Sequence, residues 1–236
     1  MGVQTRTVDM WSDIPTLLAA AHELKSPLVL IRQLSLQLES GAEHETIERI
    51  RFTAERSLRL VEGLTRVARL EDTLFENEPI HIASLYDEVV HDVMPLAKAL
   101  GQTVELSLPS RPLTIIGNRS LLYSVMLGLC DNALTHNDVA RPIELSAKKR
   151  SDRVSIGVRD HGPRTASLGE VRRRLGTAPQ TLSSRPRSSG LGLLIAEQFA
   201  RHMDATLSLT RHRGDGATFS LSLPASLQMS LFADSP

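Results

Sequence analysis

The stretch IPTLLAAAHELKSPLVLIRQLSLQL, residues 14–38, carries the pattern on which the predicted fold depends. Its apolar side chains recur at steps of three and four residues, broken only at Ser35: Ile14, Leu17, Ala21, Leu24, Leu28, Ile31 and Leu38. This spacing is typical of the seam of a coiled coil. A second run with the same kind of spacing covers residues 47–68. We therefore predict two long helices, joined by a turn at Ser40 and Gly41, that form an antiparallel hairpin.

Further aliphatic side chains broaden the apolar stripes of both predicted helices: Leu18, Leu34, Leu36, Leu58, Leu60, Val67 and Leu70. A single partner helix does not cover stripes of this width. Two hairpins that pack together as a four-helix bundle would cover them, so we expect a homodimer. The hairpin unit spans residues 14–72 and follows a short lead-in at 1–13.

Beyond Pro79 the pattern changes to short strands that alternate with helices. The expected helices cover 84–101, where Ser84 is the predicted N-cap, 120–135 and 191–202. The expected strands cover 103–108, 113–116, 143–148, 154–158, 205–210 and 218–223. This alternation is typical of helices that cover one face of a mixed sheet.

The predicted fold is therefore an α+β chain with two folded units. The hairpin unit is followed by a linker at 73–79 and by an α/β sandwich at 80–224. Inside the sandwich, residues 161–189 are rich in Gly, Pro, Ser and Arg, and a connection of this length is usually a lid or disordered. Residues 225–236 are expected to form a loose tail.

Composition and charge exclude several classes of protein. Lysine plus arginine and aspartate plus glutamate both number 27, so the chain as a whole has no net charge to attract nucleic acid or an anionic membrane. Cys130 is the only cysteine, which excludes an internal disulfide and fits a reducing compartment. No apolar run approaches the roughly 18 residues that a membrane span needs. We expect a cytoplasmic chain without direct nucleic-acid contacts; a fragment cut from a membrane protein would have the same features.

The first predicted helix carries His22 and Ser26 one turn apart, outside the apolar seam. The segment AHELKSPL, residues 21–28, resembles the H box of sensor histidine kinases, whose phosphoacceptor histidine lies on a dimeric helical hairpin. The family pattern places an acidic residue directly after the histidine, and Glu23 fits it. The zinc pattern H-E-x-x-H does not fit, because Ser26 stands where its second histidine must be.

An imidazole side chain can carry out the phosphoryl transfer that this resemblance implies. A neutral imidazole nitrogen can attack a γ-phosphoryl group while an adjacent carboxylate holds the proton on the other nitrogen. The resemblance therefore implies that His22 becomes phosphorylated and that Glu23 fixes its tautomer. It also assigns dephosphorylation of a partner receiver to the polar residue four positions after the histidine, where Ser26 keeps a hydroxyl group.

A second motif lies in GNRSLLYSVMLGLCDNALTHN, residues 117–137, which resembles the N box of the ATP-binding domain in the same family. The resemblance implies that the amide oxygen of Asn132 binds Mg²⁺, a hard ion that prefers oxygen ligands. Helical spacing places Gly128 and His136 on the same face as Asn132. Gly128 stands where the family usually has a second asparagine, and His136 stands where an aromatic ring usually flanks the adenine.

Two glycine-containing turns follow in the order that the family has. Asp160 and Gly162 resemble the G1 box, in which the aspartate accepts a hydrogen bond from the adenine amino group and the glycine permits close approach. SSGLGLLIA, residues 188–196, resembles the G2 box. There Gly190, Leu191 and Gly192 are expected to offer backbone N–H groups to phosphates at a helix start.

The resemblance implies an ATP-dependent protein-histidine kinase, with ATP and Mg²⁺ as cofactors, that phosphorylates His22. The phosphoryl group would then pass to an aspartate of a response-regulator receiver, which must be a partner protein. The alternative is a non-catalytic dimeric scaffold or phosphotransfer protein with a degenerate nucleotide site. Gly128 and Arg164, which replaces the second glycine of the G1 box, favour this alternative.

Overall fold

A computed structural model describes residues 24–25, 27–35, 44–68, 76–138, 140–162, 191–213 and 216–226. The predicted phosphoacceptor His22, its neighbours Glu23 and Ser26, and residues 163–189 of the predicted connection lie outside these residues. The described residues fall into two compact units: one holds the residues up to Val61 together with Leu191, and the other holds 62–162 and 192–226.

The described residues up to Val61 are helical, as the apolar spacing predicts. Residues 24–25 and 27–35 are helical, and α2 covers His44–Ala68 and continues into the second unit. The side chains of the two serines on the predicted seam form hydrogen bonds with the backbone of their own helix. Ser35 Oγ donates to Ile31 O at 2.9 Å and Ser57 Oγ donates to Thr53 O at 2.6 Å. Each hydroxyl is therefore hydrogen-bonded without a partner helix. Pairing of two hairpins into a four-helix bundle stays a prediction.

The second unit is built on two sheets. The larger sheet has the strand order β2-β4-β5-β7-β6, in which only β2 and β4 are parallel, and the smaller sheet pairs β1 with β3. The strands are β1 (Glu78–His81), β2 (Val104–Ser107), β3 (Thr114–Gly117), β4 (Ile143–Arg150), β5 (Arg153–Asp160), β6 (Thr206–Arg211) and β7 (Ala217–Pro224). The predicted mixed sheet is confirmed, and each of the six predicted strands is present within two residues of its expected bounds.

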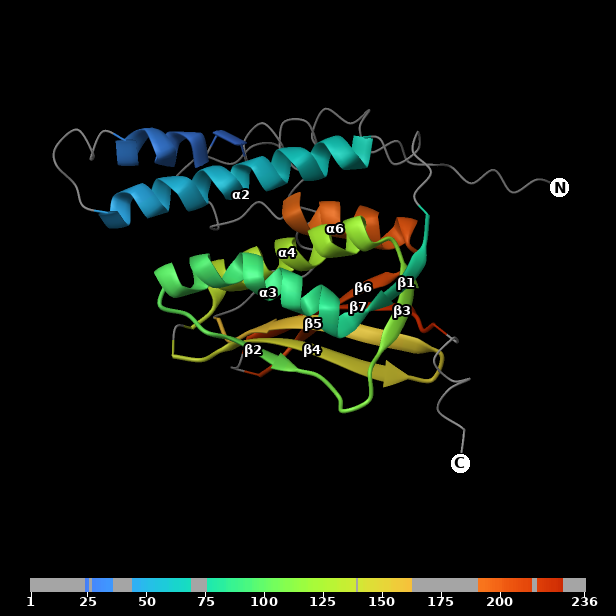
Figure 1. Cartoon of the computed structure of the whole chain (residues 1–236). Helices are drawn as coiled ribbons and strands as arrows, with labels where there is room; N and C mark the ends of the chain where they lie inside the picture. The colour runs from blue at the N-terminus through green and yellow to red at the C-terminus, as the bar shows by residue number, and fades with distance from the viewer. Residues whose placement is uncertain are drawn as a thin grey trace. The chain divides into compact units, whose positions relative to one another are not determined.

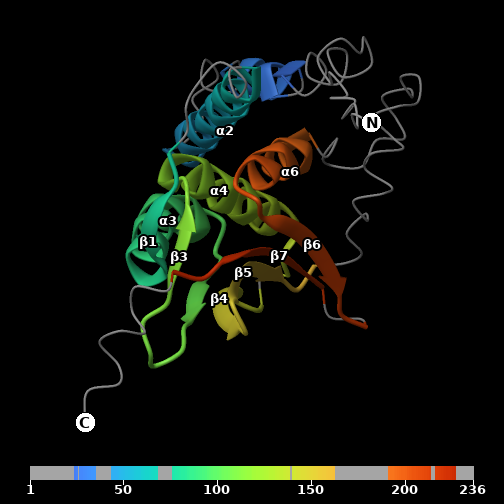
Figure 2. The ribbon, with the colours of Figure 1, turned by 90° about the vertical axis from the view of Figure 1, so that its right-hand side faces the viewer.

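Three helices cover one face of the larger sheet: α3 (Ile82–Ala99), α4 (Arg119–His136) and α6 (Leu191–His202). Figures 1 and 2 show all three on the same side of the strands. The core between the layers is aliphatic with a few aromatic rings, and its fully buried members include Leu85, Val89, Leu122, Met126, Ile156, Phe199, Phe219 and Leu221. Burial of such side chains contributes about 1.5–3 kcal/mol each. Among the described residues no helix is long and apolar enough to cross a membrane.

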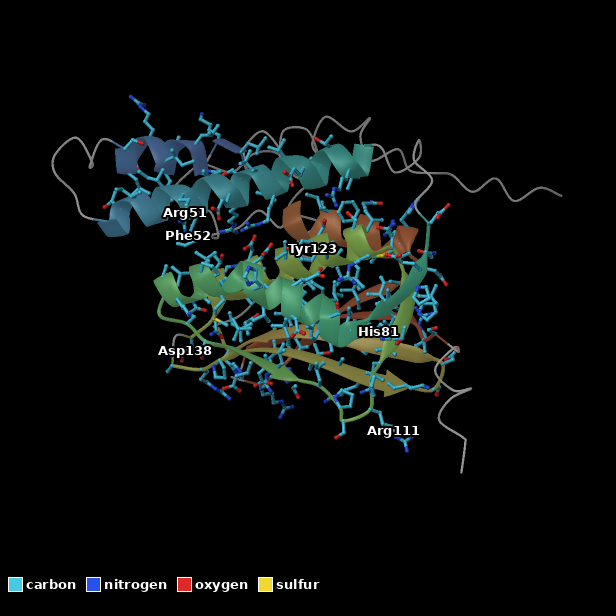
Figure 3. The ribbon with its side chains drawn as sticks, in the orientation of Figure 1. Arg51, Phe52, His81, Arg111, Tyr123 and Asp138 are labelled. Carbon is cyan, nitrogen blue, oxygen red and sulfur yellow. The ribbon has the colours of Figure 1, made fainter. Side chains whose placement is uncertain are left out.

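The start of α3 differs from the prediction. We expected Ser84 to cap this helix, but α3 begins two residues earlier, at Ile82, and its N-cap His81 makes no side-chain cap bond. The backbone N–H of Ile82 instead donates to Leu113 O at 3.0 Å, in continuation of the pairing of β1 with β3. His81, labelled in Figure 3 where β1 meets α3, lies 3.0 Å from Thr114 through its Nδ1. Tertiary pairing therefore sets this helix start, and a local capping motif does not.

Candidate functional site

α4 is the first element of the candidate site. Its N-cap is Asn118, whose side-chain Oδ1 accepts a hydrogen bond from the N–H of Leu121 at 2.9 Å. This cap satisfies one of the free N–H groups at the helix start and fixes where the helix begins. Gly128, Asn132 and His136 then follow at intervals of four residues, so they share one side of the helix.

The middle of that side of α4 is open. A Cβ atom added to Gly128 would meet nothing within 4 Å. One turn on, the Nδ2 atom of Asn132 is buried and has no hydrogen-bond partner among the described residues. A buried amide without a partner is costly in a finished core, so it commonly points to a missing ligand or water. This part of α4 therefore has both space and an unused polar group.

Asp160 ends β5 and is 1% exposed. Its Oδ1 accepts a hydrogen bond from the N–H of Gly162 at 3.1 Å, whereas its buried Oδ2 has no partner among the described residues. Burial raises the pKa of Asp160 above its ordinary value, while the bond from Gly162, the nearby backbone N–H of Ala217 and the nearby His136 and His161 lower it. The buried acceptor is costly unless a donor arrives, as an amino group of a ligand would.

Gly162 lies directly against the end of α4. A Cβ atom at this position would stand 1.6 Å from the carbonyl oxygen of His136, a distance that no side chain tolerates. Gly216 is constrained in a similar way, because it has φ of +75° and its Cβ would stand 1.9 Å from Asp160 O. Both glycines therefore let other backbone approach the turn that follows Asp160.

The structure thus brings three of the predicted site residues together: His136, Asp160 and Gly162. The predicted phosphate-binding turn is described only in part. Leu191 begins α6 and Gly192 follows it, with nothing within 4 Å of where its Cβ would be, while Gly190 lies outside the described residues. The assignment of these residues to ligand atoms stays a prediction.

Two further residues beside this turn are absent from the sequence-based list. Asn137, the C-cap of α4, accepts a hydrogen bond from the N–H of His161 through its Oδ1 at 2.8 Å. Glu144, on β4, lies 3.3 Å from Nε2 of His161. Both contacts join residues that are far apart in the chain, so no local motif reveals them. The only sequence signal is an asparagine directly after a helix.

Among the described residues no group of three or more His, Cys, Asp or Glu could hold a metal ion. A magnesium ion here would need Asn132 as one ligand and would take most of its other ligands from phosphate groups and water, as this ion commonly does. The amide of Asn132 supplies an oxygen of the kind this ion prefers, and the residue shares one side of α4 with Gly128.

Comparison with known proteins agrees with this geometry. Residues 117–227 match the family model described as histidine kinase-, DNA gyrase B-, and HSP90-like ATPase. The segment that contains α4, the Asp160 turn and α6 thus resembles an ATPase domain of this family. The chain as a whole is related to sensor histidine kinases, as the motif resemblance predicts.

Two curated relatives illustrate the extent of the match. The sensor-like histidine kinase SenX3 of Mycobacterium tuberculosis is 26% identical over 217 residues, which cover 88% of this chain and 53% of the relative. The sensor protein CutS of Streptomyces coelicolor is 29% identical over 216 residues, with coverage of 87% and 51%. The chain therefore spans about half the length of these relatives.

Solved structures share the fold. The Acinetobacter baumannii histidine kinase AdeS aligns with a TM-score of 0.61 at 18% identity and covers 86% of this chain and 97% of its own. Full-length ShkA, solved in complex with AMPPNP, aligns with a TM-score of 0.59 at 21% identity and covers 89% of this chain and 45% of its own. At these identities the likeness concerns the fold alone.

Proposed function

We propose that this chain is an ATP-dependent protein-histidine kinase. The observation that carries the proposal is the buried Oδ2 of Asp160, which has no donor among the described residues and lies beside a glycine packed against α4. A purine amino group supplies the donor that this oxygen lacks. The ATPase family match over residues 117–227 and the motif AHELKSPL at 21–28 support the same function.

In the proposed complex the ATPase domain binds the nucleotide at the carboxyl end of β5. Asp160 accepts a hydrogen bond from the adenine amino group, and the ring of His136 flanks the base. Magnesium, held on the protein side by the amide oxygen of Asn132, neutralises charge on the phosphates. The backbone N–H groups at the start of α6, around Gly190 and Gly192, donate to phosphate oxygens at the positive end of that helix.

Phosphoryl transfer in this proposal needs one nucleophile from the helical unit. The lone pair of one imidazole nitrogen of His22 forms the N–P bond while the P–O bond to ADP breaks. Glu23 holds, and then accepts, the proton of the other ring nitrogen. The phosphoryl group is afterwards passed to an aspartate of a separate receiver protein, the response regulator.

We also propose that the helical unit forms a homodimer. Six aliphatic side chains of this unit are at least 39% exposed: Leu28, Val29, Leu30, Ile47, Leu58 and Val61. Exposed apolar groups gathered on two helices favour association with a second copy. Light scattering at micromolar concentration tests this association, and a monomeric mass would contradict it.

Autophosphorylation is the direct test of the proposed function. Wild-type protein incubated with γ-labelled ATP and Mg²⁺ is expected to incorporate acid-labile label, and His22→Gln is expected to lose it entirely, because the amide nitrogen of glutamine is not a nucleophile. His44→Gln, at the first residue of α2, is a matched control that should keep full incorporation. Label that remains on His22→Gln would show that another residue is the acceptor.

Nucleotide binding separates the kinase from the non-catalytic scaffold. Magnesium and ATP together, at 100 times the dissociation constant, are expected to stabilise the fold by about 2.7 kcal/mol, because ligand binds only the folded state. A thermal melt read by fluorescence or circular dichroism measures this shift against Mg²⁺ alone. An unchanged melting temperature at millimolar ATP would favour the scaffold.

A further inference from the structure

The turn that follows β5 is held at three points by contacts with neighbouring parts of the chain. The N–H of His161 donates to Asn137 Oδ1 at 2.8 Å, the ring of His161 lies 3.3 Å from Glu144, and Gly162 packs against the carbonyl of His136. These contacts come from α4, from the residue after it and from β4. The short turn is therefore fixed by two neighbouring elements of the sandwich.

Asn137 is the central residue of this arrangement. Its Oδ1 accepts from His161, its Nδ2 donates to Arg141 O at 2.7 Å, and its own N–H donates to Ala133 O at 2.8 Å. One side chain thus links the end of α4, the connection that leads to β4, and the turn after β5. Its backbone is extended, with φ of −64° and ψ of 151°, so other residues can adopt this conformation.

The same turn orients Asp160. The N–H of Gly162 donates to Asp160 Oδ1, which leaves Oδ2 as the unpaired acceptor. The peptide that joins His161 to Gly162 carries that donor, and the N–H of the preceding peptide is the group bonded to Asn137. Rotation of these peptides would therefore change the direction in which Oδ2 points.

From this chain of contacts we infer that Asn137 is a positioning residue, which acts through the backbone of His161 to aim the Asp160 carboxylate at the amino group of an adenine base. The inference rests on the proposed binding of ATP and deepens it, since it names the residue that sets selectivity for a 6-amino purine. Glu144 supports the same turn from the other side through the His161 ring.

Arg159 completes the polar surroundings of this turn. Its Nη1 lies 3.9 Å from Glu144 Oε2, and Glu144 is thus shared between the side chains of Arg159 and His161. The His161 side chain is 1% exposed. Burial and the nearby Arg141 and Arg159 lower the pKa of His161, while Glu144 raises it. The neutral ring can still donate one hydrogen bond to Glu144.

The test compares Asn137→Ala with Asp138→Ala. Asp138, labelled in Figure 3, is exposed and lies in the same connection, where its Oδ1 accepts from the N–H of Ala140 at 3.2 Å. Its replacement therefore removes a local turn bond without touching His161. A third variant, Asn137→Asp, keeps an oxygen acceptor beside the N–H of His161.

Two measurements on the full chain are combined. Amide hydrogen exchange reports whether the N–H of His161 is held. Calorimetric titration compares ATP with purine riboside triphosphate, which lacks the 6-amino group. Asn137→Ala is expected to speed exchange of the His161 amide at least tenfold and to weaken ATP about tenfold while leaving the analogue unchanged. Asp138→Ala should match wild type in both, and Asn137→Asp should restore protection of the amide.

Four outcomes would overturn the inference. Unchanged exchange at His161 in Asn137→Ala would show that the bond does not hold the turn. Equal weakening of ATP and the analogue would show a structural role without selectivity for the amino group. If the wild-type protein binds neither nucleotide, the proposed function is overturned together with this inference. If the wild-type protein binds ATP and Asn137→Ala binds it equally well, the inference alone is overturned.

Discussion

Replacement of Asp160 by asparagine is expected to weaken ATP binding about 100-fold. The substitution puts an amide at the end of β5, where the unpaired Oδ2 now faces the proposed position of the adenine amino group. If the amide nitrogen takes that position, two donors face each other and both lose their partners. An unsatisfied buried hydrogen-bonding group costs about 1–3 kcal/mol, and more where the lost partner was charged.

The same substitution is expected to stabilise the nucleotide-free protein at neutral pH. Burial raises the pKa of Asp160 above the ordinary value of 3.8, so the folded state binds its proton more tightly than the unfolded state does. Stability therefore falls as the pH rises from 3.8 through the raised pKa, and the loss is complete above it. The asparagine side chain in the variant carries no such charge, and its advantage in melting temperature should appear only across and above that window.

Calorimetric titration and thermal melts between pH 4 and pH 8 measure the two effects of Asp160→Asn. Asp138→Asn, which replaces an exposed carboxylate after α4, is the control and should change neither quantity. Purine riboside triphosphate should bind the variant and wild type alike. If Asp160→Asn binds ATP as tightly as wild type does, this carboxylate does not accept a hydrogen bond from the adenine amino group.

The elements of the sandwich were largely predictable from the sequence, because hydrophobic periodicity reports burial within each element. The bounds of α6 agree with the prediction at both ends, and α4 extends it by one residue at each end. The strand β1 was missed. It has only four residues and includes Pro79, so it lacks an alternating apolar pattern and depends on pairing with β3.

The candidate site was predictable where a motif is contiguous and unpredictable where contacts are long-range. Asp160 and Gly162 stand two residues apart, and their turn is readable as a short motif. The approach of Gly162 to His136 joins residues from two elements, and so does the bond between Asn137 and His161. No periodicity encodes such a pair, so the role of Asn137 required the folded chain.

Replacement of Gly162 by alanine is expected to cause a large loss of stability in the second unit. The added methyl group would stand 1.6 Å from His136 O and 2.6 Å from its carbonyl carbon. Both are backbone atoms at the end of α4, so they cannot rotate away as the end of a flexible side chain would. The turn or the helix end must move, and we expect a loss of about 3 kcal/mol in the free energy of unfolding, as for severe overpacking.

Gly128→Ala is the matched control for Gly162→Ala, because it adds the same methyl group on the neighbouring helix where nothing lies within 4 Å. Alanine in a helix interior is favoured over glycine by about 0.5–1 kcal/mol, so this variant should gain a little stability.

Thermal melts of both variants measure the predicted changes in stability. For a domain of this size, the melting temperature of Gly162→Ala should fall by about 10 °C. ATP binding should fall with it, since a displaced turn no longer aims Asp160. A melting temperature for Gly162→Ala equal to that of wild type would mean that the turn does not lie against His136. The contact that fixes one side of the proposed site would then be absent.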